Sequence, residues 1–219
     1  MSIKSKTKED SRVEPMLSRL KNYSEELGLD LRKPDDRFKW FLASVLFAKR
    51  ISSETAKRTY RRFEEEGLTT PARIIEAGWD RLVEVLDSGG YVRYDFSTAS
   101  SLLESMGRLL ADYGDLDRLH EASEGSRDLE RRLMELKGVG PVCANIFLRE
   151  MRGIWEKVDP RPSEMAKSTG RRLGLEDVRP HESALVRLNL EYCKRRACGE
   201  CMFKDLCLEA VEKGAKPRT

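Results

Sequence analysis

The chain has 219 residues, of which 39% are hydrophobic and 36% charged, enough for one large or two small domains with a buried core. Its net charge of +3 comes from 41 basic and 38 acidic residues, so overall charge does not by itself indicate a nucleic-acid partner. No run approaches the roughly 18 apolar residues that a membrane-spanning helix needs, and the polar N-terminus lacks an apolar signal core. The composition therefore predicts a cytoplasmic globular protein without a membrane segment.

Residues 1–14 are polar and predict a flexible, solvated tail. Beyond them, apolar residues recur with the helical period, and no alternating strand pattern persists. The fold class is therefore predicted to be all-α. The expected helices span about residues 15–28, 37–49, 53–66, 71–77, 79–87, 95–113, 126–136, 141–153, 162–173 and 180–191.

Two segments in the first half of the chain differ from the rest. The run from Trp40 to Ala48 is the most apolar, which predicts a central helix buried nearly all round. The segment from Ser88 to Tyr94 combines two glycines with Tyr91, Arg93 and Tyr94. Its tyrosines either pack under the loop, or they form with Arg93 an aromatic and cationic edge that enters a DNA groove or unstacks bases.

A glycine turn then separates two expected helices. Gly138 and Gly140 flank Val139, and Pro141 stands where the next helix would begin. A tight turn of this kind is often only a structural connector. Its free amides and the following helix N-terminus also suit a phosphate oxygen, and we expect the acid on the next loop, Asp159, to lie near the bound group.

Four of the five cysteines fall within fifteen residues, as Cys193, Cys198, Cys201 and Cys207. Without a secretory signal, disulfides are the less expected use, and four such thiolates can bind tetrahedral zinc or a four-iron–four-sulfur cube. One compact loop with unequal gaps favours the iron–sulfur cube over zinc. Lys194, Arg195 and Arg196 lie between the first two cysteines, either as a solvated charge run or as a phosphate contact. The fifth cysteine, Cys143, is expected to be a small core residue.

The hairpin, the acid and the tetrad, in this order, resemble the helix-hairpin-helix DNA glycosylases of the endonuclease III superfamily, over about residues 30–207. The resemblance implies two helical lobes that flank a DNA-binding cleft. Residues 35–150 would form one lobe, ending in the hairpin, and residues 15–34 with 151–219 the other, carrying the cluster. It also implies that a damaged or mismatched base in double-stranded DNA is flipped out of the stack, and that the protein acts as a monomer.

Several residues depart from the family pattern. Bifunctional members carry a lysine where this chain has Val142, and valine forms no Schiff base with the sugar. Pro160 and Pro162 replace the usual residues after the acid, and the first cysteine gap is four residues instead of six. Lys49 stands where a glutamine usually fills the gap left by the flipped base.

These departures predict a monofunctional glycosylase in which the Asp159 carboxylate stabilises an oxocarbenium-like sugar or orients a water. Alkylated purines are the favoured substrate, because cationic bases leave readily and need an aromatic pocket. Uracil or thymine from mismatches stays open. The candidate pocket aromatics are Trp40, Phe47, Tyr91, Tyr94 and Trp155.

Two alternatives accompany this prediction. One is a bifunctional glycosylase and lyase that uses a displaced lysine, Lys49 or Lys137. The other is a DNA-damage-binding protein without catalysis.

The chain has no glutamine and only three asparagines beside many charged residues, which hints at a thermophilic, prokaryotic source.

Overall fold

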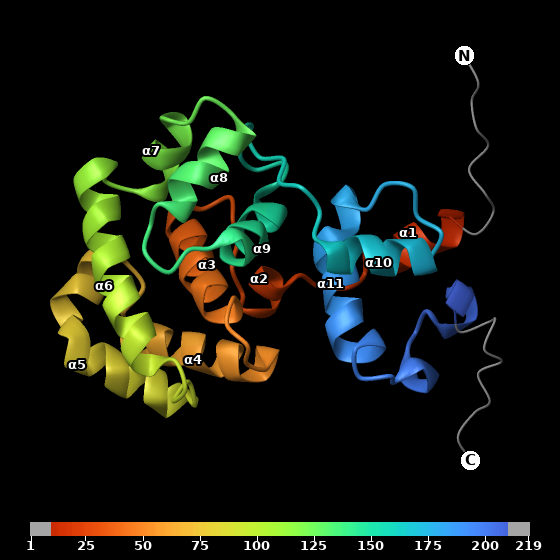
Figure 1. The fold of residues 1–219 in the computed structure, drawn as a ribbon, viewed down its shortest axis with the longest axis horizontal. Coiled ribbons are helices and arrows are strands. Elements are labelled where there is room, and N and C mark those ends of the chain that lie inside the picture. The colour runs from red at the N-terminus through yellow and green to blue at the C-terminus, as the bar shows by residue number, and fades with distance from the viewer. Residues whose placement is uncertain (1–9, 210–219) are drawn as a thin grey trace. The chain divides into compact units, whose positions relative to one another are not determined.

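The computed structural model describes residues 10–209, which form two compact units (Figure 1). The small unit combines residues 10–23 with 161–209, and the large unit comprises residues 24–160. Apart from one isolated bridge between Arg152 and Trp155, the regular structure of these residues is helical, which confirms the all-α prediction. No helix in this part of the chain has the length and apolar character needed to cross a membrane.

The unit boundaries lie about ten residues away from the predicted lobe boundaries, because two short segments belong to the large unit. The Ser24 amide donates to the Glu150 carboxylate, 3.2 Å away. The Lys157 ammonium donates to the carbonyl oxygens of His120 and Glu121, at 3.2 and 2.8 Å. These long-range bonds hold residues 24–34 and 151–160 to the large unit.

The large unit is built around one buried helix, α3. Its Trp40 and Phe41 are fully buried, and the Trp40 indole N–H donates to the Phe147 carbonyl, 3.2 Å away. The edge of the Phe147 ring meets the Phe41 ring at 5.5 Å between centroids. This burial agrees with the central helix predicted from the apolar run. The helices of the unit are α3 (Pro34–Phe47), α4 (Ser53–Glu65), α5 (Pro71–Gly89), α6 (Asp95–Asp112), α7 (Leu116–Glu121), α8 (Ser126–Met134) and α9 (Pro141–Met151), and α2 (Tyr23–Glu26) stands at the junction.

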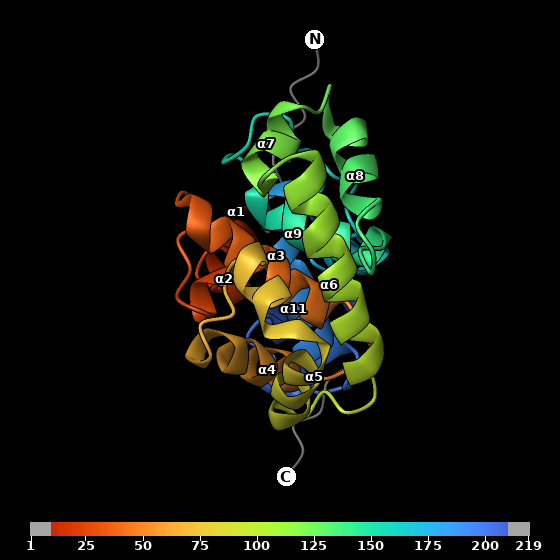
Figure 2. The ribbon, with the colours of Figure 1, turned by 90° about the vertical axis from the view of Figure 1, so that its left-hand side faces the viewer.

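Helices α5 and α6 lie side by side in the large unit (Figure 1, Figure 2). The backbone of α5 breaks at Gly78, where φ is +72°. A left-handed residue cannot continue a right-handed helix, so the two separate helices predicted on either side of residue 78 correspond to the two halves of α5. The sequence analysis missed α7, a six-residue helix whose start is capped by the Asp115 carboxylate, which accepts from the Arg118 amide at 2.8 Å.

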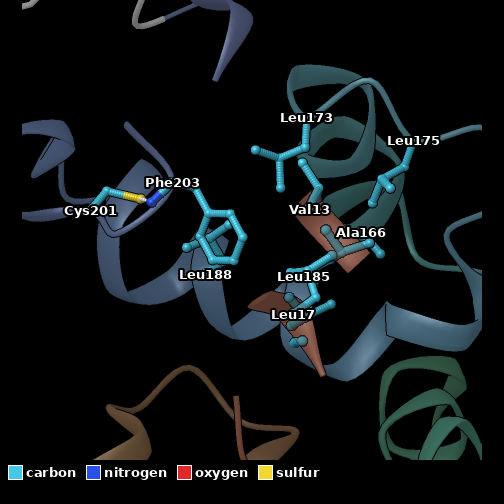
Figure 3. Close-up of a cluster of buried hydrophobic side chains, with 11 residues drawn as sticks. Val13, Leu17, Ala166, Leu173, Leu175, Leu185, Leu188, Cys201 and Phe203 are labelled. Atoms are coloured by element: carbon cyan, nitrogen blue, oxygen red, sulfur yellow. Dashed lines mark hydrogen bonds between the residues drawn. The ribbon is translucent and has the colours of Figure 1, made fainter. Parts of the chain in front are cut away.

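The small unit draws its core from both of its chain segments (Figure 3). Val13 and Leu17 of α1 pack with Leu185 of α11 and with Phe203, and all four side chains are buried. Helix α1 therefore begins before the predicted end of the tail at residue 14, and Val13 within that segment is a core residue. Residues 1–9 lie outside the described part of the chain. The elements of the small unit are α1 (Asp10–Leu17), α10 (Glu164–Arg172), η1 (Arg179–His181), α11 (Glu182–Leu188), η2 (Asn189–Cys193), η3 (Cys198–Glu200) and η4 (Lys204–Leu206).

Candidate functional site

The predicted hairpin joins α8 to α9 in the large unit. Leu136 and Val139 are buried, and the Val139 amide donates to the Leu136 carbonyl, 3.1 Å away. Gly138 has a φ of +81°, and a Cβ placed on it would lie 2.9 Å from the Cβ of Ser101 on α6. Both the left-handed conformation and this close approach require glycine. Because the Val139 side chain is buried, only its backbone is available to a ligand.

The first turn of α9 faces outward from this hairpin. Gly140 is the N-cap and has no side chain to accept from the first-turn amides, and Pro141 occupies the first helical position. Val142 is 62% exposed. Amides at a helix start have no partner within the helix, so this turn offers N–H donors and the positive end of the helix dipole to an anion.

Lys49 and the loop after α5 lie within electrostatic reach of Cys143, the third residue of α9. Burial raises the pKa of the Cys143 thiol to about 12, and the positive charge of Lys49 acts in the opposite direction. The Tyr91 side chain is also within electrostatic reach of Cys143, and its hydroxyl donates to the Leu46 carbonyl at the end of α3, 2.9 Å away. The end of α3, the loop after α5 and the start of α9 therefore meet.

Within that loop, the two predicted DNA contacts differ. Tyr91 is only 1% exposed and its hydroxyl is bonded to the backbone, so the prediction that its ring contacts DNA is not supported, and the packing interpretation applies. Arg93 is exposed, and its guanidinium lies 5.5 Å from the centre of the Tyr94 ring. Arg93 is therefore the residue of this loop that a phosphate could reach.

Most of the candidate pocket aromatics are core residues. Trp40 and Trp155 are buried along with Tyr91, whereas Phe47 and Tyr94 are half-buried. The Trp155 ring stacks on the His120 imidazole at 4.6 Å, and its indole N–H donates to Asp117 Oδ1, 2.9 Å away. Among these five rings, only those of Phe47 and Tyr94 are therefore partly accessible to a base.

Asp159 lies at the other end of α8 from the hairpin. Its amide donates to the Ser126 hydroxyl, 3.2 Å away, and Ser126 is the first residue of α8. Nine residues of α-helix rise by about 12 Å, so the acid and the glycine turn are separated by roughly that length. The Asp159 carboxylate is 64% exposed and lies 4.0 Å from the Arg152 guanidinium. The acid is therefore anchored at the start of α8, whereas the hairpin follows the end of this helix.

The four cysteines of the tetrad follow one another along an irregular stretch of the small unit. A π-helical turn, η2, ends at Cys193, and the chain then reverses with Arg196 in the left-handed conformation at a φ of +56°. The Ala197 amide donates back to the Tyr192 carbonyl, 3.0 Å away, as in a helix C-terminal cap. Cys201 is buried against Phe203, whose amide lies 3.4 Å from the Cys201 sulfur (Figure 3).

The tetrad supplies four cysteine sulfurs, the donor set of an iron–sulfur cluster, although burial favours the protonated thiol at two of them. Burial raises the pKa of both the Cys193 and the Cys201 thiol, and the Cys201 thiol is within electrostatic reach of the other three sulfurs. Sulfur ligands of iron–sulfur clusters commonly accept backbone N–H bonds of the kind that Phe203 supplies. Within residues 10–209, no three His, Cys, Asp or Glu side chains are gathered closely enough to hold one metal ion.

The basic residues of this stretch are accessible. Lys194, Arg195 and Arg196, between the first two cysteines, are all exposed in the small unit. Their exposure is compatible with both interpretations left open by the sequence, because a solvated charge run and a phosphate contact both need accessible side chains.

Three supporting residues were missed in the sequence. Ser101 contacts the hairpin glycine, Ser126 anchors the loop of the acid, and Arg172 contacts the first cysteine of the tetrad. The serines carry no sequence signal, because each acts through a contact with a distant segment. Arg172 ends an expected helix, where a basic residue is usually explained by the helix dipole.

The chain was compared with models of protein families and with curated proteins. Neither comparison gave a match.

Proposed function

We propose that this chain is a DNA glycosylase that hydrolyses the N-glycosidic bond of a damaged or mismatched base in double-stranded DNA, without cutting the strand. The observation that carries the proposal is the exposed start of α9, which has no side-chain cap at Gly140 and includes Cys143, on which the charge of Lys49 acts. This turn combines backbone donors with a cation within electrostatic reach, as a DNA phosphate contact requires. The order of hairpin, acid and cysteine tetrad adds the resemblance to helix-hairpin-helix glycosylases.

In this mechanism, the Asp159 carboxylate stabilises the positive charge that develops on the sugar as the base leaves, or orients the attacking water. Its exposure allows a sugar to approach. Since DNA rises by about 3.4 Å per nucleotide along its axis, the roughly 12 Å between acid and hairpin corresponds to three or four nucleotides. The hairpin would then grip the strand a few nucleotides from the reacting sugar.

The tetrad would hold a four-iron–four-sulfur cluster through Cys193, Cys198, Cys201 and Cys207. When bound, the cluster would cross-link this irregular stretch and hold its shape. The chain's own contribution is to fix Lys194, Arg195 and Arg196 on a single rigid loop, where they can contact phosphates.

A base-excision screen tests the proposal. Duplexes that carry alkylated, oxidised, deaminated or mismatched bases are incubated with the protein, and free base and abasic sites are measured. We expect release from at least one class, alkylated purines first, with loss of activity in Asp159→Asn. Glu156→Gln is the matched control, because Glu156 is an exposed acid on the same loop, and it should keep full activity. Activity that persists in Asp159→Asn would refute the assigned mechanism.

A lyase is the first alternative, and the position of Lys49 favours it. The charge of this lysine acts on Cys143, which directly follows Val142, the position where bifunctional helix-hairpin-helix glycosylases carry their nucleophile. Borohydride trapping on abasic DNA discriminates between the two functions, because only a Schiff base yields a covalent adduct. An adduct that disappears in Lys49→Gln but persists in Lys137→Gln would establish the lyase.

Damage binding without catalysis is the second alternative. It is favoured by the distance of Asp159 from the hairpin and by the Arg152 guanidinium 4.0 Å from its carboxylate. This function predicts tight, salt-dependent binding to abasic or mismatched duplex together with no base release across the whole screen.

A further inference from the structure

Arg172 connects both ends of the cysteine tetrad in the small unit. It is the last residue of α10, and its guanidinium lies close enough to the Cys193 sulfur to lower the pKa of that thiol, against the larger effect of burial. Its Nε also lies 3.0 Å from the Oε1 atom of Glu209, two residues after Cys207. One cation therefore contacts the first cysteine and the segment that follows the last one.

Packing of α10 against η2 places Arg172 there. The side-chain amide of Asn189 donates to the Thr169 hydroxyl, 3.0 Å away. Thr169 precedes Arg172 by three residues, and Asn189 precedes Cys193 by four, so each pair shares one face of its helix. The two faces that meet at Thr169 and Asn189 therefore meet again, one turn later, at Arg172 and Cys193.

The Arg172 side chain is only 29% exposed, and its Nε atom is buried. Among the described residues this N–H finds no acceptor in hydrogen-bond geometry, although the Glu209 carboxylate lies at ion-pair distance. A buried guanidinium is stabilised by anionic groups beside it, and here the Glu209 carboxylate is one such group and a Cys193 thiolate would be a second. Lys194, Arg195 and Arg196 differ from Arg172, because all three are exposed to water.

We propose that Arg172 is a positioning residue for the iron–sulfur cluster. Its guanidinium holds the Cys193 thiolate in place and compensates the negative charge of the cluster. The inference rests on the proposed cofactor, but it does not depend on base excision. Four thiolates give the cluster a net negative charge, which grows by one electron on reduction. A guanidinium that donates to one thiolate stabilises the reduced state more than the oxidised state, so it raises the reduction potential. It also slows loss of the ligand.

The experiment compares the full-length protein with Arg172→Gln and Arg172→Lys. Arg171→Gln is the matched control, because Arg171 is the exposed neighbour on the same helix. For each protein, iron and sulfide content, the reduction potential by voltammetry, and the rate at which a chelator bleaches the visible absorption are measured. We expect Arg172→Gln to shift the potential to more negative values and to bleach several-fold faster, and Arg171→Gln to match the wild type. Arg172→Lys keeps the charge but not the planar fork, so it should bleach at an intermediate rate.

The outcomes separate this inference from the proposed cofactor. Wild-type protein that takes up no iron and sulfide overturns the cluster and the role of Arg172 with it. Full loading of Arg172→Gln, with an unchanged potential and bleaching rate, overturns only the role of Arg172. If circular dichroism shows that Arg172→Gln is unfolded, Arg172→Lys decides, and equality with the wild type in both measurements refutes the proposal.

Discussion

Replacement of Gly138 by alanine should destabilise the large unit strongly, because this glycine meets two separate requirements. A residue with a Cβ in the left-handed conformation, here at a φ of +81°, costs about 1–2 kcal/mol. The new Cβ would also lie 2.9 Å from Ser101 Cβ, and moving α6 or the turn to relieve this overlap adds about 1 kcal/mol. The expected total is about 2–3 kcal/mol, or a fall in the melting temperature of roughly 6–12 °C for a unit of this size.

Tryptophan fluorescence during guanidinium chloride unfolding measures this effect in the large unit alone. The chain has three tryptophans, Trp40, Trp79 and Trp155, and all belong to that unit. Gly140→Ala is the control within the same turn, because Gly140 has a φ of −98° and nothing lies within 4 Å of a Cβ placed there. Gly140→Ala should lower the free energy of unfolding by at most about 1 kcal/mol, because alanine is a poorer N-cap residue than glycine.

A double variant separates the two requirements. Ser101→Gly removes the overlapping atoms but leaves the backbone of Gly138→Ala strained, so the two changes together should cost about 1 kcal/mol less than their sum. The close approach of α6 to the hairpin would be contradicted if Gly138→Ala destabilises the protein no more than Gly140→Ala. It would also be contradicted if the loss of stability in the double variant equals the sum of the two single losses.

Three further predictions concern other parts of the molecule. Burial, followed by the nearby positive charge of Lys157, lowers the pKa of His120, so the unfolded chain binds this proton more tightly than the folded one. The stability of the large unit should therefore fall as the pH drops below about 6.5, the pKa of histidine in the unfolded chain. His120→Gln should make the stability measured in fluorescence melts depend less on pH. An unchanged pH dependence in this variant would contradict the role given to His120. Leu185→Ala removes a fully buried side chain and should cost about 2–5 kcal/mol by circular dichroism, whereas a loss under about 1 kcal/mol would contradict its place in the core. Arg196→Gly should raise the free energy of unfolding by about 0.5–1 kcal/mol, because glycine adopts the left-handed conformation of residue 196 without strain. Arg195→Gly should not raise it.

Local signals in the sequence were sufficient for most of the helices of the large unit. The apolar run around Trp40 predicted the buried helix α3, because burial on all sides leaves no polar stripe. The gap at residue 78, between two expected helices, corresponds to the break in α5. The missed helix α7 is short, so its periodic signal is weak, although the cap Asp115 directly after Gly114 marks its start.

The site was less predictable, because its geometry depends on contacts between distant segments. Nothing within the loop around Tyr91 shows that its hydroxyl bonds the end of α3, forty-five residues earlier in the chain. In the same way, the spacing between Gly140 and Asp159 does not reveal that Ser126 anchors the acid at the opposite end of α8. Sequence spacing limits the reach of a loop, but it does not give its direction.

The composition of the small unit also has a consequence for biosynthesis. Val13 and Leu17 complete their core only with Leu185 and Phe203, which the ribosome adds about 170 residues later. At about 5–20 residues per second, these apolar side chains wait on the order of 10–30 s while the whole large unit is translated. A chaperone that binds the nascent N-terminal segment would therefore be most useful during this interval.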